Sequence, residues 1–170
     1  MESKTLPRIV DKAMNEFTER FMLPDRAIDG ADMPWMPFDE KGSWFKPLRF
    51  DFTTGMWINL FKVDKGAELS KHRHTGGFVI GYTIQGKWKY LEKDWSAKPG
   101  TLIFEPPGDI HTLSVDPSED MITLFMLDGS LQFIDDNNGI YREDDVFTLY
   151  KRYRDYCEAN NMLPDDNLCF

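Results

Sequence analysis

Residues 66–86 read GAELSKHRHTGGFVIGYTIQG, and residues 100–111 read GTLIFEPPGDIH. These two stretches contain all three histidines of the 170-residue chain, His72, His74 and His111. Residues two apart in a β-strand point to the same face, so the imidazoles of His72 and His74 can reach one ion together. The Pro-Pro-Gly run ahead of His111 predicts a turn, after which a second strand can direct the third imidazole to the same point. The pattern therefore predicts a divalent metal site.

The predicted ligand set consists of three neutral imidazoles. Imidazole suits iron, zinc, copper and nickel, and three protein ligands leave coordination positions open for water, substrate or dioxygen, as in catalytic sites. Neutral ligands leave the double positive charge of the ion uncompensated. We therefore expect the site to bind an anionic, chelating substrate such as an enolate or a phenolate.

Both stretches resemble the two sequence motifs of the cupin superfamily, G-x5-H-x-H-x3,4-E-x6-G and G-x5-P-x-G-x2-H-x3-N. The chain departs from the motifs at two positions. The glutamate position of the first motif holds Val79, or Phe78 with the shorter spacing, and the final asparagine of the second motif is replaced by Val115. The resemblance implies a small jelly-roll barrel in which three histidines, without the motif glutamate, form the ligand set.

The region between residues 44 and 133 has the pattern of a barrel. Short apolar stretches are separated there by turn residues at regular intervals, which is typical of sandwiches and barrels. The predicted strands are 47–53, 56–63, 69–74, 77–84, 87–92, 101–105, 110–115 and 121–128.

The segments on both sides of the barrel carry other patterns. Apolar residues at helical spacing predict helices over residues 6–23 and 144–160. Residues 32–38 are expected to form an extended arm whose large side chains pack on the barrel or on a partner subunit. The expected fold class is all-β, a cupin jelly-roll barrel with flanking N-terminal and C-terminal α-helices. The single domain divides into a helix and arm (1–43), the barrel (44–135) and a C-terminal helix and tail (136–170).

The composition argues against several classes of partner and location. A net charge of −9 argues against nucleic acid or an anionic membrane as a partner. No run of 18 apolar residues is present, and residues 1–8 lack the apolar region of a signal peptide. Cys157 and Cys169 form no metal-binding or redox motif. We expect a cytoplasmic protein that binds a small-molecule substrate.

A closer resemblance rests on five stretches: WFKPLRF (44–50), LSKHRH (69–74), GKWKYLE (86–92), DW (94–95) and EPPG (105–108). They look like the 2,4'-dihydroxyacetophenone dioxygenase family of three-histidine iron cupins, which is related to acetylacetone-cleaving dioxygenase. Members of that family use dioxygen to cleave a carbon–carbon bond next to a carbonyl. The loop after His74 and the residues around Val79 differ from the named enzyme, which leaves the substrate open.

This resemblance implies an Fe(II) enzyme that acts with O2 on a hydroxyketone or a β-dicarbonyl, with Zn, Ni and Mn as the other candidate metals. Carried over by position, His72, His74 and His111 would be the iron ligands, and Glu105 and Tyr90 lie close to the metal. Glu105 could be a general base, a hydrogen-bond partner of a ligand imidazole or an additional ligand. Tyr90 could donate a hydrogen bond to a substrate oxygen.

Strand alternation extends the predicted pocket. If Val79 points inward, it lies in the pocket beside the metal, and on the next strand Trp88 and Tyr90 face inward because Lys87 and Lys89 should face water. Arg49 and Arg73 could hold an anionic group or pair with surface carboxylates. The candidates for an aromatic wall around the substrate are Phe78, Tyr82, Trp88 and Phe104.

Two other functional classes stay open at this point. The same histidines could serve a zinc or nickel hydrolase or isomerase, or a thiol dioxygenase, because a fold alone does not select among these activities. A non-catalytic metal or ligand sensor is the second alternative, and it predicts zinc, a filled coordination sphere and a protein partner. Since cupin barrels commonly pair through strand edges, we expect a homodimer or a homotetramer.

Overall fold

The computed structural model describes residues 16, 19–21, 25–39 and 42–169. Residues 16 and 19–21 are helical, and the rest of the helix predicted over residues 6–23 lies outside the described residues. The observations below concern the barrel and the C-terminal helix, which together account for most of the described chain.

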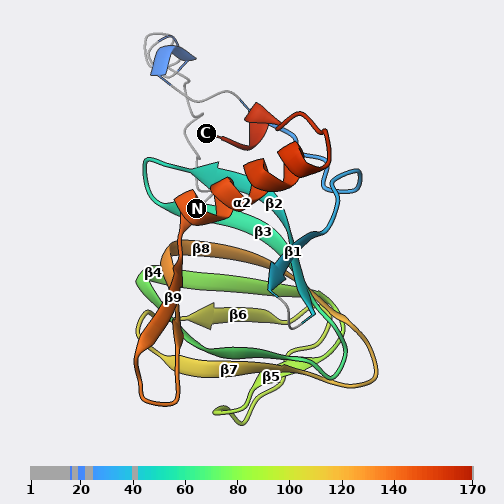
Figure 1. Ribbon diagram of the computed structural model, residues 1–170, viewed down its shortest axis with the longest axis vertical. Coiled ribbons are helices and arrows are strands. Elements are labelled where there is room, and N and C mark those ends of the chain that lie inside the picture. Colours follow the sequence, from blue (N-terminus) through green and yellow to red (C-terminus); the bar gives the residue numbers. More distant parts are fainter. Residues whose placement is uncertain (1–15, 17–18, 22–24, 40–41, 170) are drawn as a thin grey trace, which may run out of the picture.

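Among the described residues, nine strands form one antiparallel sheet that rolls into a barrel (Figure 1). Neighbouring strands follow the order β1-β2-β3-β8-β4-β7-β5, with β6 also paired to β4 and β9 to β8. The all-β prediction is therefore confirmed. The strands are β1 (Met36–Asp39), β2 (Ser43–Asp51), β3 (Met56–Val63), β4 (Glu68–Gln85), β5 (Trp88–Tyr90), β6 (Leu102–Glu105), β7 (Ile110–Val115), β8 (Met121–Ile134) and β9 (Ile140–Asp144).

Two strands are longer than their sequence patterns predict. The predicted strands 69–74 and 77–84 are one continuous strand, β4. The predicted strand 121–128 continues to Ile134 as β8. In both cases the glycines that suggested an end of the strand lie inside it.

Glycine explains how β4 and β8 continue without a turn. Gly76 lies opposite Gly129, and the pairing register shifts between Gly76 and Val79. Gly129 has a φ of 77°, and a Cβ on it would collide with the carbonyl oxygen of Thr75. Only glycine fits this close approach of two backbones. In a regular strand, residues five positions apart face opposite sides. The irregularity reverses this alternation, so His74 and Val79 are both buried.

The barrel also extends beyond its predicted bounds, 44–135. β1, within the expected arm, pairs with β2, and β9, within the expected C-terminal section, pairs with β8. Pro37 is accommodated because β1 lies at the edge of the sheet, where the missing N–H costs no ladder hydrogen bond. The arm packs on the barrel of its own chain, since Met36 and Phe38 are buried in the core.

Helix α2 (Val146–Ala159) covers one end of the barrel beside β2 and β9 (Figure 1). A capping box begins the helix: the amide of Thr148 donates to the side chain of Asp145, and the amide of Asp145 donates to the hydroxyl of Thr148. The helix predicted over residues 144–160 is confirmed, and a 3-10 helix, η1 (Asp166–Leu168), follows it. The buried face consists of Val146, Leu149, Tyr153 and Cys157.

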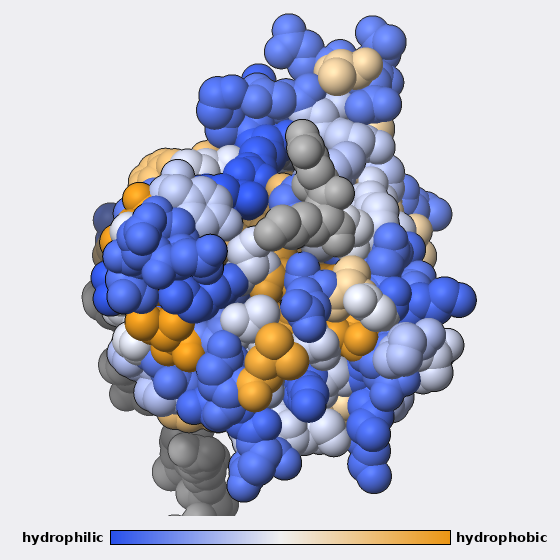
Figure 2. Space-filling view, turned by 60° about the horizontal axis from the view of Figure 1, so that its bottom comes forward, coloured by the Kyte–Doolittle hydropathy of each residue, from blue (hydrophilic) through white to orange (hydrophobic). Residues whose placement is uncertain are grey.

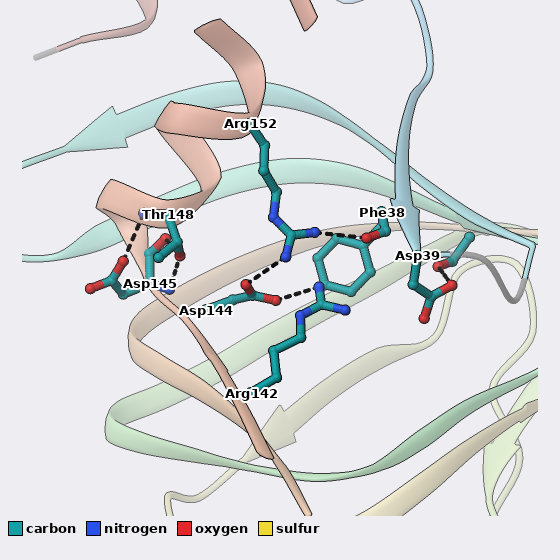
Figure 3. A network of polar contacts seen from close by, with 8 residues as sticks. Phe38, Asp39, Arg142, Asp144, Asp145, Thr148 and Arg152 are labelled. Carbon is teal, nitrogen blue, oxygen red and sulfur yellow. Dashed lines mark hydrogen bonds and ion pairs between the residues drawn. The ribbon is translucent and has the colours of Figure 1, made fainter. Parts of the chain in front are cut away.

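A network of ion pairs ties β9, α2 and β1 together (Figure 3). Oδ2 of Asp144 lies 2.5 Å from Nη2 of Arg142, and Oδ1 accepts a hydrogen bond from Nη2 of Arg152 at 2.9 Å. Arg152 also donates to the carbonyl oxygen of Phe38 at 2.7 Å. The two guanidinium groups lie over the Phe38 ring, 4.7 and 5.4 Å from its centroid. These contacts fix the position of Phe38 inside the barrel.

The outer surface carries charged side chains together with exposed hydrophobic ones, among them Leu102 and Phe104. Figure 2 shows a mostly hydrophilic face with a few separate hydrophobic areas. This agrees with a chain in which 29% of the residues are charged. Within the described part of the chain, no helix is long and apolar enough to cross a membrane.

Gly129→Ala is expected to lower the free energy of unfolding by about 3 kcal/mol or more, because the new methyl group collides with the β4 backbone as well as straining φ. Gly100→Ala is the matched control. Gly100 also has a positive φ, of 88°, but a Cβ there meets nothing within 4 Å. The control should therefore lose only about 1 kcal/mol. Urea denaturation measures both, and equal small losses would contradict a close approach of β4 and β8.

Candidate metal centre

Three histidine side chains meet inside the barrel. His72 and His74 lie on β4, and His111 lies on β7 directly opposite His72 in the antiparallel pair. One nitrogen from each imidazole can be chosen so that all three lie within 4.8 Å of one another, and all three residues are buried. The two sequence stretches thus bring their histidines to one point.

Neighbouring groups fix the orientation of the imidazoles. Nδ1 of His72 donates to the carbonyl oxygen of Ser70 at 2.7 Å, which leaves the lone pair of Nε2 free for a metal ion. The amide of Gly108 donates to the carbonyl oxygen of His74 at 2.8 Å, so the turn between β6 and β7 is attached to β4 beside the site. The ring of Tyr90 stacks on that of His111, with centroids 3.7 Å apart.

A carboxylate lies beside the imidazoles on strand β6. Glu105 is opposite Val79 in the β4–β6 pair, and Val79 occupies the position of the motif glutamate. The neighbouring strand therefore supplies a carboxylate next to the position where the motif glutamate is absent. Oε2 of Glu105 lies 3.3 Å from Nε2 of His74 and 3.4 Å from Nε2 of His111. Oε1 accepts a hydrogen bond from the hydroxyl of Tyr90 at 2.7 Å. Glu105 and Tyr90 therefore both lie next to the histidines.

Burial controls the protonation of these groups. It lowers the pKa of His72 to about 3, with His111 adding to the effect, and it lowers the pKa values of His74 and His111 as well. The imidazoles are therefore neutral at neutral pH, which is the state that binds metal. Burial raises the pKa of Glu105 to about 7, although the hydrogen bond from Tyr90 opposes this rise. Burial, and then the charge of Glu105, raises the pKa of Tyr90 well above its usual value.

The donor set fits a divalent transition metal. Nε2 of His111 and Oε2 of Glu105 are buried without a hydrogen-bond partner among the described residues, although they are only 3.4 Å apart. A buried polar atom left unpaired costs about 1–3 kcal/mol, and a cation near both atoms would remove that cost. Imidazole nitrogen and carboxylate oxygen are ligands of such ions. His72, His74 and His111 would hold the ion, with Glu105 beside it.

His72 and His74 border a small apolar cavity, whereas His111 and Glu105 are not part of its lining. Its free volume is about 40 Å³, which is room for about three water molecules. A ligand in this space would be surrounded mainly by hydrophobic side chains. The polar residues in its lining are His72, His74, Tyr90 and Asn59. The hydrophobic residues are Phe38, Phe45, Trp57, Phe61, Leu69, Leu113, Phe125, Leu127, Leu131 and Leu149.

Most of this lining was not identified from the sequence. The lining residues of β1, β2, β3 and β8 are far in sequence from the histidine motifs, and only alternation along each strand marked them as inward-facing. Alternation cannot show which inward positions surround a cavity and which fill the core. Asn59 was detectable as a polar residue at an inward position of β3.

The predicted aromatic wall is wrong for three residues. Phe78, Tyr82 and Phe104 lie on the outer face of the barrel and are 38%, 46% and 63% exposed. Because the irregularity in β4 turns Val79 inward, its neighbour Phe78 and the later Tyr82 point outward. Phe104 points outward because the next residue of β6 points inward. Val79 and Trp88 are buried as predicted but do not line the cavity.

The two candidate arginines are also absent from the cavity lining. Nη2 of Arg49 pairs with Oδ2 of Asp51 at 3.2 Å. Nε of Arg73 donates to the side-chain oxygen of Gln132 at 2.9 Å. Arg49 thus pairs with a carboxylate, which was one of its two expected roles, whereas Arg73 pairs with a side-chain amide.

Comparison with known proteins gives the same fold. Residues 24–132 match the ChrR cupin-like domain family. An RmlC-like cupin protein from Ralstonia eutropha JMP134 is 36% identical, with a TM-score of 0.80 over 85% of this chain and 94% of that chain. An acetylacetone dioxygenase from Acinetobacter johnsonii is 20% identical, with a TM-score of 0.71 over 79% of this chain and 94% of that chain. No curated protein matches the sequence. The cupin fold implied by the histidine motifs is confirmed.

His74→Ala and His111→Ala are each expected to reduce bound metal from about one ion per chain to a small fraction of that. Each removes one of three imidazoles, and the remaining pair binds weakly. Arg73→Ala is the control, because Arg73 lies between the two β4 histidines but pairs with Gln132. Elemental analysis after loading with Fe(II) or Zn(II) and desalting measures the content. Full occupancy in either histidine variant would contradict the site.

Proposed function

The chain belongs to the ChrR cupin-like family, and we propose that it is a non-haem Fe(II) dioxygenase. Its reaction would cleave the carbon–carbon bond next to a carbonyl group of a hydroxyketone or a β-dicarbonyl. The observation that carries the proposal is the cluster of three neutral imidazoles beside the Tyr90–Glu105 hydrogen bond, at an apolar cavity. The likeness in fold to an acetylacetone dioxygenase supports the same class of reaction.

The bound iron would supply a binding site for dioxygen and for the oxygen atoms of the enolised substrate. Glu105 is positioned to take the α-proton of the substrate at Oε2, because that atom faces the histidines and has no hydrogen-bond partner among the described residues. The Tyr90 hydroxyl stays protonated and donates a hydrogen bond to Oε1 of Glu105. This hydrogen bond holds the carboxylate in its orientation. The stack of Tyr90 on His111 fixes that imidazole in turn.

The cavity contributes the shape and the exclusion of water. Its walls are hydrophobic side chains of Phe, Leu and Trp, so an enolised substrate would meet few competing water molecules. The free volume of about 40 Å³ is smaller than any of these substrates, so side chains of the lining would have to move to admit one.

A non-catalytic zinc site is the second candidate, and one observation favours it. Oε2 of Glu105 lies 3.3 and 3.4 Å from one nitrogen each of His74 and His111, a spacing that also suits a fourth ligand to one ion. Three histidines and a glutamate would then close a tetrahedral sphere, as in structural zinc sites. In that case the protein would bind zinc tightly and show no turnover.

Oxygen uptake by anaerobically Fe(II)-loaded protein distinguishes the two candidates. We expect substrate-dependent uptake with at least one compound in a panel of β-dicarbonyls and hydroxyketones. Glu105→Gln should keep its iron but lose about 100-fold or more of this rate, because an amide cannot take the α-proton. Tyr90→Phe serves as a milder comparison, since it retains the carboxylate and removes only its hydrogen bond.

The metal content of Glu105→Gln distinguishes a base from a metal ligand at this position. Iron retained without turnover in Glu105→Gln is the result expected for a base. A parallel loss of iron or zinc would instead make Glu105 a ligand. No uptake by the fully iron-loaded wild type with any compound, together with tight zinc binding, would contradict the dioxygenase proposal.

A further inference from the structure

Asn59 is the polar residue of the cavity that the proposed reaction does not use. It lies in the middle of β3, is 5% exposed and faces the cavity. Trp57 and Phe61, which face the same way on β3, are hydrophobic and line the cavity too. A leucine of similar size would suit these surroundings better than a carboxamide does.

The side chain of Asn59 has an unmet hydrogen-bonding requirement. Its Oδ1 is buried and has no hydrogen-bond partner among the described residues. An acceptor left in this state lowers stability by about 1–3 kcal/mol. Oδ1 itself has almost no accessible surface, but Asn59 borders the cavity, so a turn of its carboxamide would let a donor group in that space satisfy this oxygen. The observation therefore points to a ligand with a donor at this position.

The cavity lining brings Asn59 into the same space as two metal-binding residues, His72 and His74. Across β3, β8, β4 and β6, one row of paired residues contains Trp57, Leu127, Val79 and Glu105. Asn59 is two residues along β3 from Trp57, which is about 7 Å. Because Asn59 and the imidazoles of His72 and His74 line one cavity, a molecule bound in it can contact both.

We infer that Asn59 is a specificity residue that accepts a hydrogen bond from a hydroxyl group of the substrate. The inference rests on the proposed function, which places the carbonyl end of the substrate at the three histidines. It narrows the substrate class to compact, enolisable carbonyl compounds that carry a hydroxyl group at the opposite end. An analogue that lacks the hydroxyl leaves Oδ1 unpaired and binds more weakly.

Calorimetric titration of Zn(II)-loaded protein tests this without turnover, since zinc has no redox chemistry. The probes are acetylacetone and its 1-hydroxy derivative. We expect wild type to bind the hydroxylated compound at least about tenfold more tightly, the effect of one net hydrogen bond. Asn59→Leu should bind both compounds equally and unfold at the same temperature as wild type or higher. If Asn59→Leu does not fold, Asn59→Ala takes its place.

Thr123→Val is the matched control. Thr123 is also fully buried with an unpartnered oxygen, Oγ1, but it does not line the cavity. This variant should keep the preference of wild type for the hydroxylated compound. A preference that disappears in Thr123→Val as well would show a general effect of the barrel interior and overturn the role of Asn59.

The remaining outcomes separate this inference from the proposed function. Equal binding of both compounds by wild type, or binding of neither, overturns the role of Asn59. The role of Asn59 is also overturned if Asn59→Leu still binds the hydroxylated compound more tightly than acetylacetone. A preference that depends on Asn59, in a protein whose iron form consumes no oxygen, supports the binding role and contradicts only the dioxygenase proposal.

Discussion

The pairing of His72 with His111 across β4 and β7 is the constraint on which the site depends. Because side chains alternate between the two faces of a strand, a slip of one residue would turn one imidazole out of the barrel. The hydrogen bond from Gly108 to His74 attaches the preceding turn to β4 and so opposes such a slip. The close approach of β4 and β8 at Gly129 then sets which later residues of β4 face inward.

The barrel interior carries more unpaired polarity than its folding requires. Nε2 of His111, Oε2 of Glu105 and Oδ1 of Asn59 are all buried without hydrogen-bond partners among the described residues. Each such atom lowers the stability of the empty fold. The hydrophobic core and the Asp144 network offset this, since they hold the cavity walls in place. A metal ion and a ligand that satisfy these atoms would therefore stabilise the fold that binds them.

Local spacing was enough to predict the histidine cluster and an all-β sandwich or barrel, and the resemblance to the cupin motifs selected the barrel. The H-x-H pair fixes two side chains on one face, and the Pro-Pro-Gly turn restricts where His111 can lie. Local spacing could not predict that Gly76 and Gly129 lie inside continuous strands, because their role depends on a partner backbone far away in sequence. The role of Asn59 was missed for a related reason, since its exposure to the cavity depends on strands β4 and β8. Phe78 and Tyr82 were misplaced for a different reason, because alternation from an inward Val79 already puts both on the outer face.

X-ray absorption spectroscopy of the iron-loaded protein tests the metal centre most directly. We predict nitrogen and oxygen neighbours at about 2.1 Å from the iron, and more distant scattering that fits three imidazole rings. The spectrum of His111→Ala should fit one ring fewer if any iron remains bound. Fewer than three rings in wild type, or sulfur from Cys157 or Cys169 at the iron, would contradict the three-histidine site.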